Sequence, residues 1–248
     1  MAAGTRRSAS LGTAFRGLCG PYNLGPGFPM SEGVIKFRCH WTREPIPLDP
    51  AASAGLLMWR SRLREQGLLG VDADGVGYGN VSVRVRPVQE RRGREPGSSG
   101  PSFLITGSGT GGLAEIDDTH LSLVTDCRIE ENLLFCRGLS EASSESLSHA
   151  AIYRAGAEVG AVIHAHSARL WGEHLGKLPS TPPDVGYGTP EMALSLESIV
   201  GRLSDHDELG RSQHVVVMGG HPDGLIAYGR DLDEAGEELL GLVLGQAG

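Results

Sequence analysis

The chain has 248 residues, a formal net charge of −8 and 40% hydrophobic residues, which is enough for one large domain or two small ones. An acidic chain without a basic face gives no reason to expect a nucleic-acid partner. No apolar run approaches the ~20 residues of a membrane helix, and the four cysteines show no close pairing typical of a disulfide framework. These features predict a soluble, cytoplasmic protein that binds neither nucleic acid nor membranes.

The first thirty residues differ in composition from the rest. Residues 1–30 contain three arginines and no acidic residue, with many Gly, Ser and Pro residues and no sustained periodicity. They lack the apolar stretch of a secretory signal and only weakly resemble a transit peptide. We interpret them as a disordered tail, or as the product of an upstream start codon with Met30 as the natural beginning. One domain is then expected over residues 31–248.

The elements expected in the first half are one helix and three strands. Residues 48–70 form the helix, because Asp49 can cap it, Pro50 suits its first turn and Gly67 can end it. The valines of residues 79–87 alternate with Ser and Arg, the period of a half-buried strand. Two further strands are expected over 102–106 and 120–126.

The second half mixes strands and helices without a regular alternation. Such a mixture favours a single α/β domain, in which a mixed or mainly antiparallel central sheet is flanked by helices in an α/β/α arrangement. The expected helices cover 143–156, 189–203 with Thr189 as cap, and 231–244 with a capping-box-like Asp231 and Glu234; the expected strands cover 161–166, 214–218 and 224–228.

Two histidines lie one residue apart at the end of an apolar strand. His164 and His166 follow the apolar residues 161–163. Side chains two apart on a strand point to the same face, so both imidazoles can project together. Neutral ring nitrogens could then share a cation at ~2.0–2.1 Å. The alternative is a strand end with two polar residues, each hydrogen-bonded locally.

A third histidine, His221, ends another strongly apolar strand inside a Gly-rich turn. A third imidazole would complete a facial triad of nitrogen ligands with open positions for water or substrate. That layout is typical of a catalytic metal site rather than a closed structural one. His164, His166 and His221 are therefore candidate ligands of a divalent metal.

Ser143, Ser144 and Glu145 fall at the N-terminus of an expected helix. The backbone N–H groups and the helix dipole favour an anion there, and serine hydroxyls can add donors to a phosphate or carboxylate. Near a metal, Glu145 can act as a ligand or as a general base. The alternative is a serine N-cap followed by an ordinary first-turn glutamate.

Two glycine-containing turns are further candidates for anion binding. Residues 77–84 and 104–113 place Asn80 and Thr106, respectively, beside glycine at the edge of a strand. Exposed N–H groups in such turns form anion-binding concavities. The segment 107–112 lacks the P-loop lysine and the Rossmann spacing. Each segment alone is also compatible with an ordinary turn.

Taken in order, these motifs resemble the class II aldolase/adducin family. The match extends from about Gly79 to Ala235, and the preceding helix also fits. The resemblance implies an α/β/α fold and a homotetramer with active sites between subunits. The motifs are "GNVSVR", "ITGSGT", "SSE" followed by "HAAIY", "VIHAHS" and "HPDGLIAYGRDLDEA".

The resemblance also implies a site and a reaction. It implies cleavage of a carbon–carbon bond in a phosphorylated sugar or related hydroxy-ketone, through an enediolate stabilised by a divalent metal, usually zinc and alternatively manganese. Glu145 would move the proton. The implied metal ligands are His164, His166 and His221, and the implied phosphate-binding residues are Asn80, Thr106, Gly107, Ser143 and Ser144.

The sequence departs from the family pattern in two places. The usual His-Gly after the last metal strand is here His221-Pro222-Asp223-Gly224, an expansion by two residues. The tyrosine that lies before the "FGT" segment of the aldolases is also missing: Asp184 stands near that place and Tyr187 lies closer to the turn. This second departure bears on the aldol reaction more than on the metal site. His149, one helical turn after Glu145, matches a histidine common in the family and is expected to give a supporting hydrogen bond.

Three functions are compatible with the pattern. The first is a metal-dependent lyase, and the second is a sugar-phosphate epimerase or dehydratase on the same scaffold. The third is a non-enzymatic oligomerisation module like the adducin head. The three histidines together with Glu145 favour an enzyme, because a binding module needs none of them.

Overall fold

A mixed sheet of eight strands forms the centre of the computed structural model, which describes residues 35–85, 100–205 and 214–245. The strand order is β1-β7-β6-β5-β4-β8-β10-β9. Strand β1 runs parallel to β7, and the other neighbours in the sheet are antiparallel. The strands are β1 (Arg38–Arg43), β4 (Asn80–Arg84), β5 (Phe103–Thr106), β6 (Leu121–Arg128), β7 (Leu133–Gly138), β8 (Ala161–His166), β9 (Val215–Val217) and β10 (Gly224–Gly229), while β2 (Gly70–Val71) and β3 (Gly77–Tyr78) form a separate small hairpin.

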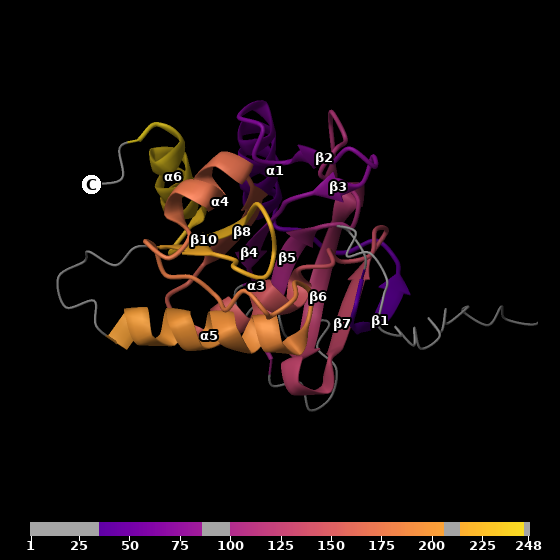
Figure 1. Ribbon diagram of the computed structural model, residues 1–248. Coiled ribbons are helices and arrows are strands. Elements are labelled where there is room, and N and C mark those ends of the chain that lie inside the picture. Colours follow the sequence, from indigo (N-terminus) through magenta and orange to yellow (C-terminus); the bar gives the residue numbers. More distant parts are fainter. Residues whose placement is uncertain (1–34, 86–99, 206–213, 246–248) are drawn as a thin grey trace, which may run out of the picture.

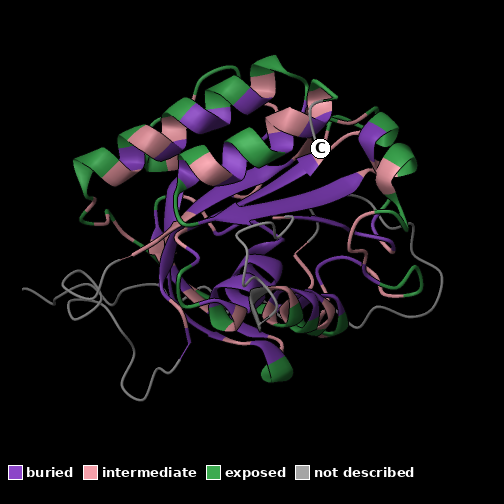
Figure 2. Ribbon diagram, turned by 90° about the vertical axis from the view of Figure 1, so that its left-hand side faces the viewer, coloured by how far each residue is buried: buried purple, intermediate pink, exposed green. Residues whose placement is uncertain are grey.

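Helices cover both faces of the sheet. Helices α1 (Pro50–Glu65), α4 (Ala168–His174) and α6 (Leu232–Val243) lie on one face, and α3 (Ser146–Ala155) and α5 (Pro190–Asp205) lie on the other (Figure 1). Each face has its own hydrophobic cluster. The helices turn buried residues toward the sheet and exposed residues outward (Figure 2). The expected α/β/α fold with a mixed sheet is thus confirmed.

The helix ends follow the local sequence signals. The side chain of Asp49 accepts a hydrogen bond from Ala51 N at 3.0 Å, so it caps α1 as expected. Thr189 Oγ1 accepts from Met192 N at 3.3 Å at the start of α5. At the start of α6, Asp231 accepts from the backbone N–H of Glu234. These caps satisfy N–H groups that a helix leaves unpaired at its beginning.

Helix α3 begins later than the sequence predicted. Its first residue is Ser146, and the expected first-turn residues Ser143, Ser144 and Glu145 lie in a turn before it. In that turn Ser146 N donates to the carbonyl of Ser143 at 3.0 Å. The prediction that these residues form the first helical turn was therefore wrong, because the chain reverses tightly before the helix starts.

Strand β4 differs from the half-buried strand that was expected over residues 79–87. Ser82 is as fully buried as its neighbour Val81. Its hydroxyl lies 2.7 Å from His149 Nδ1 and 2.8 Å from the Tyr153 hydroxyl, both on α3. The expected polar face is covered because a helix packs on each side of this central strand. Residues 86 and 87 of the expected strand lie outside the described part of the chain.

Strands β1 and β7 were not predicted from the sequence. β1 lies at the edge of the sheet and its side chains are half-buried or exposed, so it lacks the apolar run that marks an interior strand. The expected tail, residues 1–30, lies outside the described residues. Among the helices of the described part of the chain, none combines the length and the apolar character needed to cross a membrane.

Candidate metal centre

Strand β8 supplies two histidines from the middle of the sheet. β8 is hydrogen-bonded to β4 on one side and to β10 on the other, which fixes its backbone. His164 and His166 share the sheet face of Val162, which belongs to the hydrophobic cluster beneath α3 and α5. His164 is fully buried and His166 is half-buried.

The turn between β9 and β10 supplies the third histidine. His221 N donates to the carbonyl of Met218 at 3.1 Å, and Gly224 N donates to the carbonyl of His221 at 2.9 Å. A Cβ on Gly220 would lie 1.9 Å from the carbonyl of Val185, so only glycine allows this close approach. The two additional residues fit into the turn, where Asp223 has a left-handed φ of 67°. The expansion leaves His221 buried within the turn, only 2% exposed.

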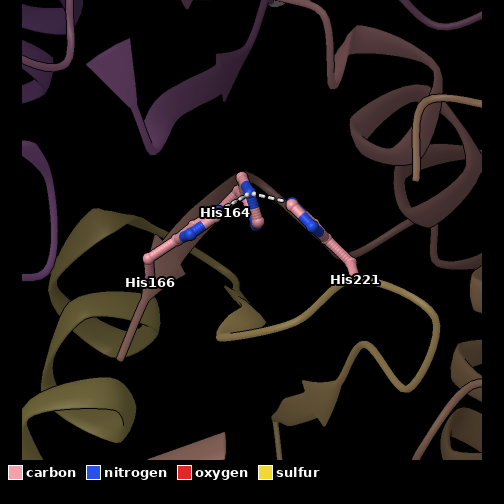
Figure 3. A group of neighbouring side chains, drawn as sticks. All are labelled: His164, His166 and His221. Carbon is pink, nitrogen blue, oxygen red and sulfur yellow. Dashed lines mark hydrogen bonds between the residues drawn. The ribbon is translucent and has the colours of Figure 1, made fainter. Parts of the chain in front are cut away.

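The three imidazoles converge on one point (Figure 3). His164 Nε2 lies 3.1 Å from His166 Nε2 and 3.2 Å from His221 Nε2. Ligands around a tetrahedral cation at ~2.0–2.1 Å are separated by about 3.3 Å, so the donor set fits a metal such as zinc. Within residues 35–85, 100–205 and 214–245, these histidines are the one group of at least three potential metal ligands.

Burial keeps two of these imidazoles neutral. The pKa of His164 is held well below its usual range by burial and then by its neighbours His166, His221 and His149. The pKa of His221 is lowered well below its usual range by burial, followed by His166 and Lys36. A neutral imidazole offers the lone pair that a metal requires, so both rings are ready for coordination at neutral pH.

Aromatic side chains pack against the two outer imidazoles. Tyr78, at the end of the β2–β3 hairpin, stacks on His166 with ring centroids 4.9 Å apart. Tyr187, in the loop before α5, stacks on His221 at 4.4 Å. Tyr187 was expected near the turn, but neither stacking contact was predicted, because each contact joins segments far apart in the chain. These rings restrict the imidazoles to the observed orientations.

Glu145 stands at the N-cap of α3. Its side chain is fully buried, and the hydroxyl of Ser148 donates to Oε2 at 2.7 Å. A Cβ on Gly188, next to Tyr187, would lie 3.9 Å from Glu145 Oε1. Since the preceding residue, Tyr187, stacks on His221, the Glu145 carboxylate and the His221 ring both approach this short segment of the loop.

The predicted phosphate-binding residues gather at the ends of β4 and β5. Asn80 pairs in register with His164, and Gly107 forms a bridge with Ala142, directly before Ser143. The five predicted residues are all buried: Asn80, Thr106, Gly107, Ser143 and Ser144. The strand pairing, the bridge and the contact of Thr106 with Val81 bring these segments together, with Asn80 next to His164 in the sheet.

Not every predicted donor in this group is available to an anion. The N–H of Gly107 donates to the carbonyl of His120 at 2.7 Å, and the hydroxyl oxygen of Thr106 accepts from Val81 N at 3.2 Å. Asn80 Oδ1, which can only accept a hydrogen bond, is buried without a hydrogen-bond partner among the described residues. A buried orphan of this kind indicates a place for a ligand donor.

His149 is a buried residue of α3 that contacts the sheet. Its Nδ1 contacts the hydroxyl of Ser82, as described above, and its ring lies beside Phe103. Burial lowers the pKa of His149 to about 3, so the ring is neutral in the folded protein. The sequence-based expectation of a supporting hydrogen bond is met by Ser82, a partner on a different element.

The comparison with protein families identifies the chain. The sequence profile described as "Class II Aldolase and Adducin N-terminal domain" matches residues 70–242. The chain belongs to the class II aldolase and adducin family. The resemblance inferred from the sequence motifs is thus confirmed, and the family match includes all the candidate site residues. Among curated proteins, none matches the chain.

Solved structures of the class II aldolase family share the fold. An L-fuculose 1-phosphate aldolase superimposes with a TM-score of 0.57 at 20% identity, covering 81% of this chain and 84% of that one. The L-fuculose-1-phosphate aldolase of Thermus thermophilus gives 0.53 at 22% identity, with 80% and 92% covered. YgbL of Escherichia coli, described as a candidate aldolase/epimerase/decarboxylase, gives 0.53 at 19%, with 79% and 86% covered. At these identities the likeness shows a common fold.

Proposed function

We propose that this protein is a divalent-metal-dependent lyase that cleaves a carbon–carbon bond in a phosphorylated sugar or related hydroxy-ketone. The observation that carries the proposal is the convergence of three imidazole Nε2 atoms on one point. The buried carboxylate of Glu145 approaches Gly188, next to the tyrosine that stacks on His221. Membership of the class II aldolase and adducin family supports a lyase. The similarity to L-fuculose 1-phosphate aldolase supports a sugar-phosphate substrate.

The three histidines would hold the cation. A divalent ion, zinc in this proposal and manganese as the alternative, supplies Lewis-acid stabilisation of developing negative charge on oxygen when bound. His164 is oriented for this role because its Nδ1–H donates to the carbonyl of Leu225 at 3.0 Å, leaving the Nε2 lone pair for the cation. The stacked Tyr78 and Tyr187 keep the outer two rings in place.

Glu145 would move the proton. In the cleavage direction the substrate hydroxyl loses its proton, the carbon–carbon bond breaks to release an aldehyde, and the electron pair stays with the other fragment. That fragment is then protonated at carbon, and we assign the transfer to the Glu145 carboxylate. Ser148 holds Oε2 by a hydrogen bond and thereby fixes the orientation of the carboxylate.

The group at the ends of β4 and β5 would hold the substrate phosphate. The side chains of Asn80, Ser143 and Ser144 offer amide and hydroxyl donors, and the Thr106 hydroxyl can donate while its oxygen accepts from Val81 N. Fixing the phosphate there positions the carbon chain relative to the imidazoles and lowers the entropic part of the barrier. We further propose that the chain assembles into a homotetramer, which native mass spectrometry would test.

Elemental analysis and product analysis test this function. Protein loaded with zinc or manganese and then dialysed should hold about one metal per chain, and a small fraction of one would favour an adducin-head-like module instead. A panel of phosphorylated and free sugars should then yield dihydroxyacetone phosphate and an aldehyde from a ketose phosphate. Loss of water or inversion of a stereocentre without cleavage would identify a dehydratase or an epimerase.

A further inference from the structure

A buried network of hydroxyl groups and one imidazole joins the central strand β4 to helix α3. Ser82 Oγ lies 2.7 Å from His149 Nδ1 and 2.8 Å from the Tyr153 hydroxyl. All three side chains are buried. None of them belongs to the imidazole triad or to the proposed phosphate group. The network therefore has a role that the proposed function does not explain.

The contacts of Ser82 fix where the protons of this network lie. Among the described residues, the Tyr153 hydroxyl finds its hydrogen-bond acceptor in Ser82 Oγ, so its proton lies on that contact. Ser82 has one proton of its own to donate. His149 Nδ1 lies 2.7 Å away, whereas the carbonyl of Val162 lies at 3.5 Å, the long limit of a hydrogen bond, so Ser82 donates to Nδ1. A neutral imidazole that accepts at Nδ1 carries its proton on Nε2.

The protonated nitrogen of His149 is the unpaired one. His149 is fully buried, and its Nε2 has no hydrogen-bond partner among the described residues. Buried polar groups are nearly always hydrogen-bonded to protein, ordered water or a ligand. The bond to Ser82 and the neighbouring ring of Phe103 hold the imidazole in its orientation. An oxygen that accepts a hydrogen bond is therefore expected at Nε2.

Asn80 offers a matching unpaired group on the same face of the sheet. Asn80 and Ser82 are two residues apart on β4, so their side chains share one face. Asn80 Oδ1 is also buried without a partner among the described residues, and it needs a donor. An O–H group satisfies both atoms, since it accepts from the imidazole and donates to the amide oxygen. A fully ionised phosphate, which only accepts, satisfies the imidazole alone.

The spacing of the two residues on the strand suits one bridging oxygen. Residues two apart on a strand are separated by ~6.4–6.8 Å. Two hydrogen bonds of ~2.7–2.9 Å to a common oxygen span about 5–6 Å. His149 is attached to Ser82, and Asn80 is the next residue along that face. One O–H group can thus connect α3 to the start of β4.

We propose that a buried O–H group bridges His149 Nε2–H and Asn80 Oδ1 and thereby turns the NH₂ group of the Asn80 amide toward the substrate phosphate. The O–H group is a water molecule in the free protein, and a substrate hydroxyl is the other source of the same chemistry. His149 is then a positioning residue that acts through Asn80. The bridge itself does not require the cation, whereas its effect on phosphate binding rests on the proposed function.

NMR of the histidine rings in the full-length, zinc-loaded protein tests the bridge directly. With ¹⁵N-labelled histidine, the ring of His149 is identified among the nine histidines by the signals that are missing from His149→Asn. The ring should show the Nε2–H tautomer, and the Nε2 proton should give a rotating-frame cross-peak to water with the sign of direct contact.

Dihydroxyacetone phosphate separates the two sources of the O–H group. A water cross-peak that survives addition of this probe identifies a permanent water. A cross-peak that disappears while the Nε2 signal shifts identifies a substrate hydroxyl that takes its place. The Nδ1–H tautomer, or an Nε2 proton with neither a water cross-peak nor a shift, would overturn the inference.

Two variants of the same network test the effect on Asn80. His149→Phe removes both nitrogens and should weaken binding of inorganic phosphate about fivefold or more in calorimetric titration. Tyr153→Phe is the matched control, because it removes a buried hydroxyl from α3 and leaves the bond between Ser82 and His149. It should keep the tautomer, and its phosphate affinity should stay within about twofold of the parent.

The outcomes separate this inference from the proposed function. Equal weakening of phosphate in both variants, or none in His149→Phe, would show that the network only supports α3, and the positioning role would be overturned. If inorganic phosphate does not bind the parent, the phosphate group of the proposed function fails, and the His149 signals of the parent alone decide whether the bridge exists. Those signals also decide it if His149→Phe does not fold.

Discussion

His164 donates through Nδ1–H to the carbonyl of Leu225, on the neighbouring strand β10, over 3.0 Å. Because a carbonyl can only accept, this bond fixes the tautomer and leaves Nε2 as the lone-pair nitrogen. That nitrogen is shared by both short contacts to His166 and His221. His164 is therefore the central member of the triad, and its orientation is set by the sheet rather than by the other two histidines.

Removal of this central ligand should abolish metal retention. His164→Ala leaves two imidazoles, which hold a labile cation poorly, so metal content after loading and dialysis should fall from about one per chain to a small fraction. Elemental analysis checks this, with circular dichroism to confirm that the fold remains. His174→Ala, on the surface helix α4, is the control and should keep its metal. An unchanged metal content in His164→Ala would refute its assignment as a ligand.

Glu145→Gln should separate metal binding from proton transfer. The amide is almost isosteric with the carboxylate and can still contact Ser148, so fold and metal content should stay as in the parent. Turnover of an identified substrate should fall about 10²- to 10⁴-fold, the usual contribution of a positioned acid/base. Glu237→Gln, on an exposed position of α6, should have no effect. Turnover at the parental rate would mean that Glu145 has another role.

The sequence predicted the elements whose ends carry their own signals. Helix α1 has Asp49 and Pro50, and α6 has Asp231, so each could be placed from local chemistry. The position of β8 was equally clear, because an apolar run ends at His164. The three imidazoles could be grouped because each closely follows an apolar run in the sequence.

Other features depend on partners that are distant in the sequence. Ser82 is polar and alternates with valines, yet α3 covers it, and nothing near residue 82 indicates that helix. β1 pairs in parallel with β7 across a long connection, and its half-exposed side chains give no strand pattern. Lys36 and Tyr187 contact each other over 151 positions, so their meeting at the metal centre becomes visible only in three dimensions.

Gly236→Ala should destabilise the protein even though alanine favours helices. Gly236 lies on α6, and a Cβ there would lie 2.1 Å from the ring of Trp59, which is buried and donates to Asp233 at 2.7 Å. Overpacking of this kind costs about 1–3 kcal/mol. Gly241→Ala on the same helix meets no atom within 4 Å and should stabilise by about 0.4–1 kcal/mol. Urea unfolding of both variants checks the contrast, and equal effects would contradict it.

Arg60 should be important for the glycine-rich loop after β5. It is buried on α1, and its guanidinium donates to the carbonyls of Thr110 at 2.7 Å, Gly111 at 3.1 Å and Ala114 at 3.3 Å, and also to that of Leu113. Arg60→Met leaves these carbonyls unpaired, so the free energy of unfolding should fall by about 2–4 kcal/mol in urea denaturation. Arg169→Met, which loses only the surface ion pair with Glu173, should cost less than about 1 kcal/mol. A comparable loss in both variants would argue against this role.

Acid should destabilise the metal-free protein through His149. Its folded pKa of about 3 lies below the ordinary value of 6.5, so the unfolded state binds the proton first. The contribution of His149 to stability is therefore fully present above about pH 6.5, and it is lost as pH falls toward the folded pKa. His149→Asn removes this group and keeps an amide for Ser82.

Urea unfolding of the parent and His149→Asn at two pH values measures this effect. Between pH 7 and pH 5.5 the parent should lose about 1 kcal/mol more than the variant. Between pH 7 and pH 8 the two should run parallel, because the unfolded imidazole is already neutral there. A variant that loses stability as steeply as the parent on acidification would exclude His149 as the source.

The hairpin that carries His221 shows how a ligand can keep its place in space while its sequence pattern changes. His221 is held from the residues before it. Its N–H donates to the carbonyl of Met218, and Gly220 lies close to the carbonyl of Val185. The bend after it, with Asp223 in a left-handed conformation, can then vary in length without displacing the nitrogen. Search patterns that demand His-Gly at this place would pass over such chains, whereas patterns anchored on the preceding apolar strand and its paired glycines would find them.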